Sequence, residues 1–201
     1  MFEHCRAFIA ADNPNVAEIL GLTARSLGFG EIASQYPRVA MRGARIALTY
    51  FFADARTGDN ALLELLDTVR EQKSHRLCFS PVVLFTADDS PRVELKYTRL
   101  GFDDVIALPV AQDVLAERLA QQLERPQLYI ETKDYLGPDR RRLDYGAELR
   151  IAASPYTQVL FERDPRHGVR VLEREQRGYR FRPQPNSATH YMPKLFGLPA
   201  R

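Results

Sequence analysis

The sequence predicts a doubly wound α/β fold, in which a five-stranded parallel sheet is covered by helices on both faces. Short apolar runs alternate with segments of helical periodicity over residues 1–126, and this alternation is typical of parallel strands joined by crossover helices. The run at residues 46–53 is almost wholly apolar, as expected of a central strand buried on both faces. With 201 residues, 45% of them hydrophobic, the chain is long enough for one full core and an appendage.

The strands and helices follow from these runs and from their capping residues. Strands are expected at residues 6–11, 31–34, 46–53, 81–86 and 104–109. Asn13-Pro14 begins the first helix, and Ser90-Pro91 begins a later one that Gly101 ends. Two further helices are expected at residues 60–70 and 111–124, whereas residues 35–43 give only a weak helical signal. The sequence therefore implies five strands and five helices.

Pro126 divides the chain into a domain at residues 1–126 and an arginine-rich extension at residues 127–201. In the extension we expect short strands at residues 148–152, 156–162 and 168–173, the last two joined as a hairpin. An isolated hairpin is only marginally stable in water, so it must pack on the domain, pair with a partner chain or be partly disordered. Residues 183–201 contain four prolines and no periodic apolar pattern, which indicates a flexible end.

The net charge of +2 is unevenly distributed. Residues 1–126 carry 14 Lys and Arg against 17 Asp and Glu, and residues 127–201 carry 14 against 9. The basic extension suggests either an anionic partner or a solvated surface. Neither a membrane-length apolar run nor a signal-peptide core is present, so we expect a cytoplasmic protein without a membrane partner. Cys5 and Cys78 have no CxxC spacing or nearby His, which favours reduced thiols over a metal site.

In a doubly wound sheet the functional crevice lies at the carboxyl ends of the strands. The strand ends read Ala-Ala-Asp-Asn-Pro at residues 10–14, Pro-Val-Val-Leu-Phe-Thr-Ala at 81–87, and Gly-Phe-Asp-Asp-Val-Ile-Ala-Leu-Pro at 101–109. These segments resemble the strand ends of receiver domains of two-component response regulators, including chemotaxis-type receivers. The resemblance covers about 60% of the chain and implies a flavodoxin-like receiver fold.

The resemblance also implies a set of crevice residues, of which this sequence has only some. Receivers carry an acidic pair after the first strand, a phosphoacceptor Asp after the third, a Thr or Ser after the fourth, and Lys-Pro after the fifth. Here the crevice residues are Asp12, Thr86, Leu108 and Pro109. One carboxylate of the acidic pair is replaced by Ala11, and Leu108 stands where the lysine is expected. Val105 occupies the place where many receivers have an aromatic residue coupled to the threonine.

Spacing favours Asp54 as the phosphoacceptor candidate, because the apolar run before it is uninterrupted. Two alternatives stay open: an earlier end of the strand places Thr49 or Tyr50 there, or Asp54 is an ordinary solvated residue at a strand end. Asp12 and Asp54 alone form a weak Mg²⁺ candidate, and no other cofactor is indicated. We therefore expect weak or absent phosphorylation, with Thr86 as either a relic of the crevice or an ordinary hydroxyl.

The string at residues 129–142 is the most distinctive in the extension. Gly137-Pro138 predicts a turn, and the residues that follow place guanidinium groups near an aromatic ring. The candidate ligand-binding or partner-binding residues are Tyr135, Asp139, Arg140, Arg141 and Arg142.

This string resembles a Tyr-x-Gly-Pro-Asp-Arg-Arg-Arg tail of some alphaproteobacterial receiver-like proteins. More loosely, it resembles arginine-rich extensions by which certain chemotaxis-type receivers bind cyclic di-GMP. Three interpretations stay open: the arginines bind Asp103, Asp104 or Asp113 as an internal strap, bind a nucleotide second messenger, or bind a protein.

The predicted function is a pseudo-receiver that signals by binding a partner protein and is not an enzyme. GxSxG, HExxH, Walker and dinucleotide motifs do not occur. The sequence argues against DNA as a partner, since basic and acidic residues are interleaved in the extension and no helix-turn-helix pattern follows Pro126. The alternatives are a cyclic di-GMP effector, a conventional receiver phosphorylated on Asp54, and a homodimer formed through the hairpin at residues 156–173.

Overall fold

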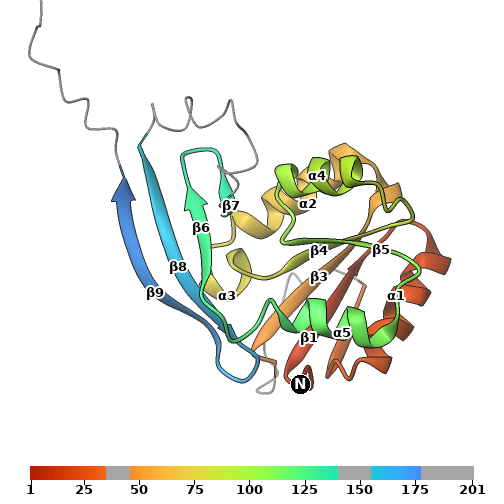
Figure 1. Ribbon diagram of the computed structural model, residues 1–201. Helices are drawn as coiled ribbons and strands as arrows, with labels where there is room; N and C mark the ends of the chain where they lie inside the picture. The colour runs from red at the N-terminus through yellow and green to blue at the C-terminus, as the bar shows by residue number, and fades with distance from the viewer. Residues whose placement is uncertain (35–45, 140–154, 178–201) are drawn as a thin grey trace, which may run out of the picture.

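The computed structural model describes residues 1–34, 46–139 and 155–177, which form two sheets lying side by side (Figure 1). The strands of the first sheet are β1 (Cys5–Ala10), β2 (Glu31–Ala33), β3 (Leu48–Asp54), β4 (Val82–Thr86) and β5 (Asp104–Ala107). Those of the second sheet are β6 (Gln127–Glu131), β7 (Leu136–Pro138), β8 (Tyr156–Asp164) and β9 (Gly168–Arg177). The helices are α1 (Pro14–Ser26), η1 (Ala55–Thr57), α2 (Asp59–Arg70), α3 (His75–Cys78), α4 (Pro91–Leu100) and α5 (Gln112–Ala120).

The first sheet has the strand order β2-β1-β3-β4-β5, and every neighbouring pair is parallel. This is the flavodoxin-like, doubly wound order, which receivers share. All seven residues of β3 are buried, because helices cover the sheet on both sides. One apolar cluster joins the sheet to α1 and α5, and another joins it to α2 and α4. The predicted fold class is confirmed.

The helices begin where the capping residues predict. The side chain of Asn13 accepts hydrogen bonds from the backbone N–H groups of Asn15 and Val16 at the start of α1. Gly101, at φ 143°, follows α4. The weak helical signal at residues 35–43 falls outside the described residues. Helix α3 was not predicted, since its four residues are too few to show a helical period.

The second sheet contains the predicted hairpin, formed by β8 and β9, together with two unpredicted strands. Its order is β7-β6-β8-β9, and all its pairs are antiparallel. The turn predicted at Gly137-Pro138 is wrong, because both residues lie in β7. The chain turns between β6 and β7 instead, where the N–H of Thr132 donates to the carbonyl of Tyr135 at 2.8 Å. The predicted strand at residues 148–152 and the flexible end at 183–201 fall outside the described residues.

Gly137 is needed in β7 because the Tyr135 side chain lies over it. A Cβ atom at residue 137 would come within 2.5 Å of the Tyr135 hydroxyl oxygen. This hydroxyl donates a hydrogen bond to the carbonyl of Pro138 at 3.0 Å. The glycine therefore permits the ring to fold back on its own strand.

The second sheet packs against the amino ends of β4 and β5. Tyr129, Val159 and Phe161 of this sheet form an apolar cluster with Phe79, which precedes β4. The rings of Phe79 and Phe161 have centroids 4.5 Å apart. The hairpin thus packs on the first sheet, which is one of the three arrangements expected for it.

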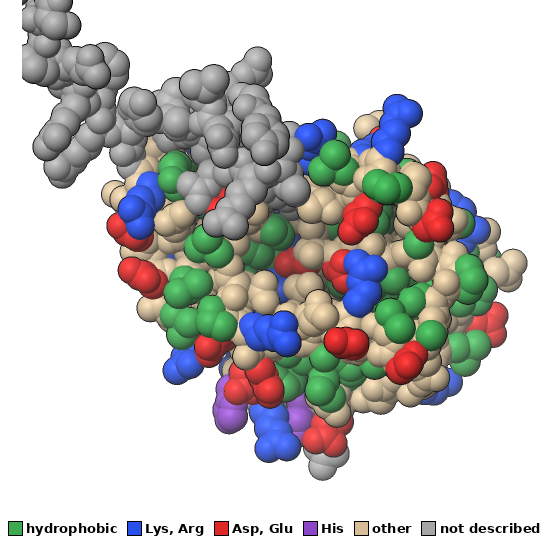
Figure 2. Space-filling view, viewed as in Figure 1, with side chains coloured by type: hydrophobic (Ala, Val, Ile, Leu, Met, Phe, Trp, Pro, Cys, Tyr) green, Lys and Arg blue, Asp and Glu red, His purple; other side chains and the backbone are tan. Residues whose placement is uncertain are grey.

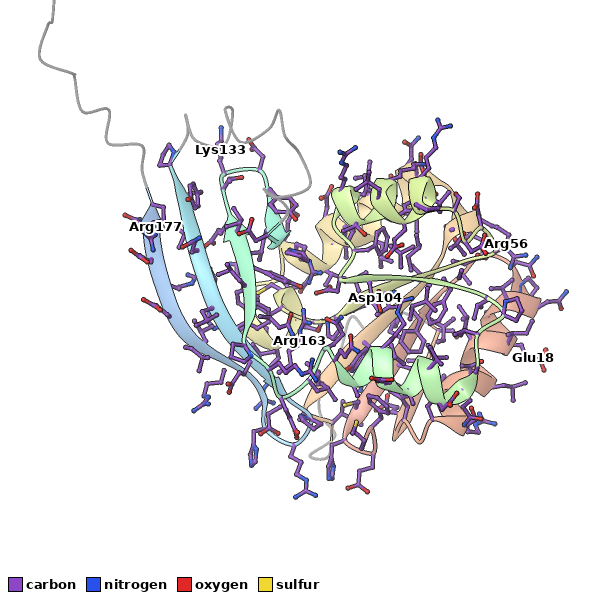
Figure 3. The ribbon with its side chains drawn as sticks, viewed as in Figure 1. Glu18, Arg56, Asp104, Lys133, Arg163 and Arg177 are labelled. Carbon is purple, nitrogen blue, oxygen red and sulfur yellow. The ribbon has the colours of Figure 1, made fainter. Side chains whose placement is uncertain are left out.

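A buried polar network joins the two sheets, with the Asp103 carboxylate at its centre. The Nη2 atom of Arg163, on β8, lies 2.7 Å from Oδ1 of Asp103, and Nη2 of Arg70, on α2, lies 2.7 Å from Oδ2. The Tyr129 hydroxyl also donates to Oδ1, and the backbone N–H of Val82 donates to Oδ2. The side chains of Arg163 and Asp103 are 0% and 3% exposed. Arg163 lies between the sheets in Figure 3.

The rest of the Arg163 side chain is also satisfied. Its Nε donates to the carbonyl of Phe79 at 2.7 Å, and its Nη1 donates to the side chain of Gln122 at 2.8 Å. Burial by itself would raise the pKa of Asp103, but the guanidinium groups of Arg163 and Arg70 outweigh it and lower this pKa to about 2. The network is therefore charged under ordinary conditions.

Replacing Arg163 with Ala should destabilise the fold by about 3–5 kcal/mol, because it leaves buried Asp103 with one of its two cations. A matched control is Arg170→Ala on β9, whose side chain is 72% exposed and pairs with Glu162. That change should cost less than about 1 kcal/mol. Urea unfolding measures both, and equal effects would contradict a central role for the buried pair.

Acid should weaken the network. The folded-state pKa of Asp103 lies below the ordinary value of 3.8, so its stabilisation is complete above about pH 4 and is lost as the pH falls toward about 2. The loss is on the order of 2 kcal/mol. Urea unfolding of wild type and Asp103→Asn across this range should show their stability difference shrinking. A constant difference would contradict the assignment.

Candidate functional site

The predicted crevice residues lie at one edge of the first sheet. Asp54 is the last residue of β3 and pairs in register with Phe85 of β4, and Thr86 pairs with Ala107 of β5. Asp12 follows β1 and Leu108 follows β5, so these residues share the edge at which parallel strands end.

The two residues that an earlier strand end would place at the crevice lie inside β3. These are Thr49 and Tyr50, both buried. The Tyr50 hydroxyl donates to the carbonyl of Leu119 on α5 at 2.9 Å. Asp54, rather than either of them, therefore ends the strand.

Asp54 is bound by a cation that the sequence analysis did not identify. The Nε atom of Arg56 lies 3.2 Å from each carboxylate oxygen of Asp54, and the Arg56 backbone N–H donates to Oδ1 at 3.2 Å. The Asp54 side chain is 6% exposed and the Arg56 side chain 62% exposed. Asp54 is the N-cap of η1, and an N-cap Asp commonly accepts a hydrogen bond from the residue two positions later. The backbone contact with Arg56 could therefore have been predicted from the sequence, because Arg56 is two positions after Asp54.

The opposite side of the crevice is mostly apolar. Ala11, Leu108 and Val110 pack against the cluster that joins the sheet to α1 and α5. Leu108 donates its N–H to the carbonyl of Thr86 at 2.8 Å, and the Leu108–Pro109 peptide bond is cis. The position at which a receiver lysine is expected is thus part of the apolar packing.

Thr86 and Asp12 complete the crevice. The hydroxyl of Thr86 accepts the N–H of Asp88 at 3.1 Å, which makes a local turn after β4. Asp12 is exposed. In the part of the chain that the structure describes, no group of three or more His, Cys, Asp or Glu could hold a metal ion. The weak Mg²⁺ candidate formed by Asp12 and Asp54 stays a prediction, and Arg56 is placed to compete with a metal ion for the Asp54 oxygens.

The predicted binding residues of the extension are only partly described. Asp139 donates its N–H to the carbonyl of Leu128 at 3.1 Å, and Tyr135 folds over Gly137 as above. Arg140, Arg141 and Arg142 lie outside the described residues, so a strap, a nucleotide site and a protein contact at these positions stay predictions.

Two of the carboxylates suggested for such a strap have other partners. Asp103 is bound by Arg163 and Arg70, and Asp104 forms an ion pair with Arg118 of α5. Arg118 also donates to the carbonyl of Val105 at 3.0 Å. Val105 itself is 5% exposed and packs in the cluster of α2 and α4.

The second sheet and the crevice lie at opposite ends of the first sheet. Figure 3 shows Arg56 far from Arg163, Lys133 and Arg177. In Figure 2, basic and acidic side chains are interspersed over the visible described surface. Among the described residues, no helix has both the length and the apolar character that a membrane crossing requires.

Comparison with known proteins gives similarity in structure alone. No family model matches the chain, and no curated protein sequence matches it. The chemotaxis protein CheY4 of Vibrio cholerae is 18% identical with a TM-score of 0.44, over 58% of this chain and 97% of that chain. A response regulator from Thermotoga maritima is 19% identical with a TM-score of 0.42, over 58% and 94%.

A third similar structure is the signal receiver domain of a signal transduction histidine kinase from Syntrophus aciditrophicus. It is 24% identical with a TM-score of 0.39, over 65% of this chain and 96% of that chain. The strand order of the first sheet, and not these similarities, defines the fold.

Asp54 and Arg56 should be energetically coupled. A double-mutant cycle with Asp54→Asn and Arg56→Ala should give a coupling free energy of about 1 kcal/mol, since the carboxylate is buried and the guanidinium partly solvated. Urea unfolding at low and high salt measures this value, which salt should reduce. A coupling near zero would mean that the ion pair does not stabilise the crevice.

Proposed function

We propose that this chain is a pseudo-receiver: a cytoplasmic signalling domain with the receiver fold that binds partner proteins and does not depend on aspartyl phosphorylation. The observation that carries the proposal is the ion pair between Asp54 and Arg56. It occupies the one carboxylate at the end of β3 with a cation from the same chain.

The chemistry of phosphorylation explains why this ion pair matters. Phosphoryl transfer to Asp needs a divalent ion held by oxygen ligands and a cation near the phosphoryl oxygens. Ala11 supplies no carboxylate to the first requirement, and Leu108 supplies no cation to the second. The Nε atom of Arg56 lies 3.2 Å from each Asp54 oxygen and competes with a metal ion and a phosphoryl group for them. Each of the three residues therefore acts against the transfer.

Binding is the remaining way for such a domain to signal. The strand order and the strand-end motifs support a receiver origin, and Asp12, Asp54, Thr86 and Pro109 keep receiver residue types. The strand ends of a receiver are present, but the second carboxylate and the lysine are replaced by Ala11 and Leu108, which supports a domain that is not switched by phosphorylation. Partners would then recognise its surface directly.

The test is phosphorylation of the full chain by acetyl phosphate with Mg²⁺, followed by intact mass spectrometry. Wild type should gain no phosphoryl mass, because the acceptor is bound by Arg56. Phosphorylation of wild type that Asp54→Asn abolishes would overturn the proposal and make the chain a conventional receiver.

A restored variant provides the positive control. Ala11→Asp, Arg56→Ala and Leu108→Lys together return the second carboxylate, free Asp54 and add the cation. This triple variant should become labelled, and adding Asp54→Asn to it should remove the label. Labelling that persists in the Asp54→Asn background would show that another residue is modified.

A further inference from the structure

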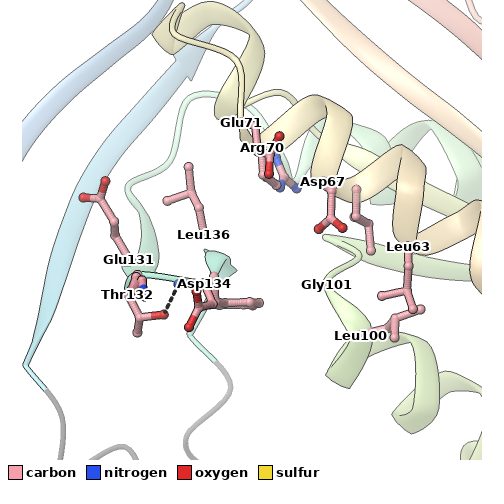
Figure 4. Close-up of a pocket in the computed structure, with 13 residues that line it drawn as sticks. Leu63, Asp67, Arg70, Glu71, Leu100, Gly101, Glu131, Thr132, Asp134 and Leu136 are labelled. Atoms are coloured by element: carbon pink, nitrogen blue, oxygen red, sulfur yellow. Dashed lines mark hydrogen bonds between the residues drawn. The ribbon is translucent and has the colours of Figure 1, made fainter.

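A groove lies where the second sheet meets α2 and α4, well away from the crevice. Its volume is about 420 Å³, and its walls come from α2, from the end of α4, and from the β6–β7 turn with the adjoining strand ends (Figure 4). Its apolar lining residues are Leu63, Leu66, Leu100 and Leu136. Leu63 is 39% exposed, so the groove offers an accessible apolar surface. We call this site the interdomain groove.

The rim of the interdomain groove is acidic. Asp67 and Glu71 lie one helical turn apart on α2 and its end, and Asp134 lies on the β6–β7 turn. All three are exposed, and no ion pair joins them to another described residue. The fourth acidic residue, Glu131, pairs with Arg174. Lys133 is the one exposed cation among the described lining residues. The rim therefore carries unbalanced negative charge.

Arg70 connects a wall of the interdomain groove to the buried polar network around Asp103. This residue lines the groove, and its side chain is 6% exposed. Its Nη atoms bind Asp103 and the carbonyls of Cys78 and Ser80, yet its buried Nε has no hydrogen-bond partner. Arg70 therefore ties this wall of the groove to Asp103, and its Nε atom is buried rather than open to the groove.

We propose that the interdomain groove binds a basic, amphipathic segment of a partner protein. Lysine or arginine side chains of the segment pair with Asp67, Glu71 and Asp134, and its apolar side chains cover the leucines. An anionic ligand does not suit three unpaired carboxylates, so phosphate groups and nucleic acids are disfavoured. The combination of an apolar floor and a charged rim is typical of grooves that take an amphipathic peptide.

This inference rests on the proposed function, because it names the chemistry of the partner that a binding domain requires. It uses a different part of the molecule, and so it fails separately. Phosphorylation of Asp54 tests the crevice, whereas Asp67 and Glu71 lie at the other end of α2. If Asp54 is phosphorylated, peptide binding in the groove can still be measured, and if no peptide binds, the phosphorylation test of Asp54 still stands.

The experiment measures binding of a fluorescent amphipathic Lys/Leu peptide to the full chain, with a Glu/Leu peptide as the negative probe. Asp67→Lys/Glu71→Lys should weaken Lys/Leu binding at least about tenfold, since two favourable pairs become repulsive. The matched control is Asp113→Lys/Glu117→Lys on α5, which has the same spacing and the same charge change and should leave binding within about twofold. Thermal unfolding should show both variants folded, because all four side chains are exposed.

Several outcomes would overturn the proposal. Equal weakening by both variants would show general attraction to an acidic domain, and weakening by neither would place the peptide elsewhere. NMR shifts on peptide addition should centre on Leu100, Gly101 and residues 131–136, and shifts confined to other elements would contradict the site. Binding that emerges only in Arg140→Ala/Arg141→Ala/Arg142→Ala would make this chain's own arginines the occupant, in place of a partner.

Discussion

The buried contact between Arg163 and Asp103 is the constraint on which the arrangement of the two sheets depends. A guanidinium with no exposed surface is tolerated only where every donor and the charge itself are satisfied. Asp103, Gln122 and the carbonyl of Phe79 meet this need for Arg163. All three belong to the first part of the chain. If β8 separated from the first sheet, Arg163 and Asp103 would lose each other as buried charge partners. The apolar cluster around Phe79 adds burial to the same contact.

This constraint also divides the molecule by function. The second sheet covers the amino ends of β4 and β5, whereas the crevice lies at their carboxyl ends, where Asp54 is bound by Arg56. None of the described strands of the extension can therefore take part in crevice chemistry. What the extension creates is the interdomain groove, since the β6–β7 turn forms one wall and α2 and α4 form the other. Arg70 connects the groove to the buried network, because it lines the groove and also binds Asp103.

The edge strand β9 of the second sheet could pair with β9 of a second copy of the chain, and its charges bear on that pairing. Among the described strands, β9 ends the order β7-β6-β8-β9, and an edge strand can be a template for another strand. Along β9, Arg170, Glu173, Arg174, Glu175 and Arg177 alternate in sign over short distances. Symmetric antiparallel pairing about Arg174 would oppose like charges, which disfavours that register. The edge thus carries the charged residues that commonly protect exposed strands.

The sequence by itself determined the features that depend on neighbours along the chain. Apolar runs and caps placed the five parallel strands and the starts of α1 and α4, and a turn between two β-patterned runs predicted the β8–β9 hairpin. Spacing also favoured Asp54 as the last residue of β3, with Thr49 or Tyr50 left open. Tertiary structure decided the rest: that residues 127–131 and 136–138 form strands, that Asp103 is buried, and that a groove lies between the second sheet and helices α2 and α4. Asp103 and Arg163 are 60 residues apart, and no local pattern specifies a partner at that distance. Whether a charge is buried with a counter-ion or left in solvent is settled only when the two sheets pack.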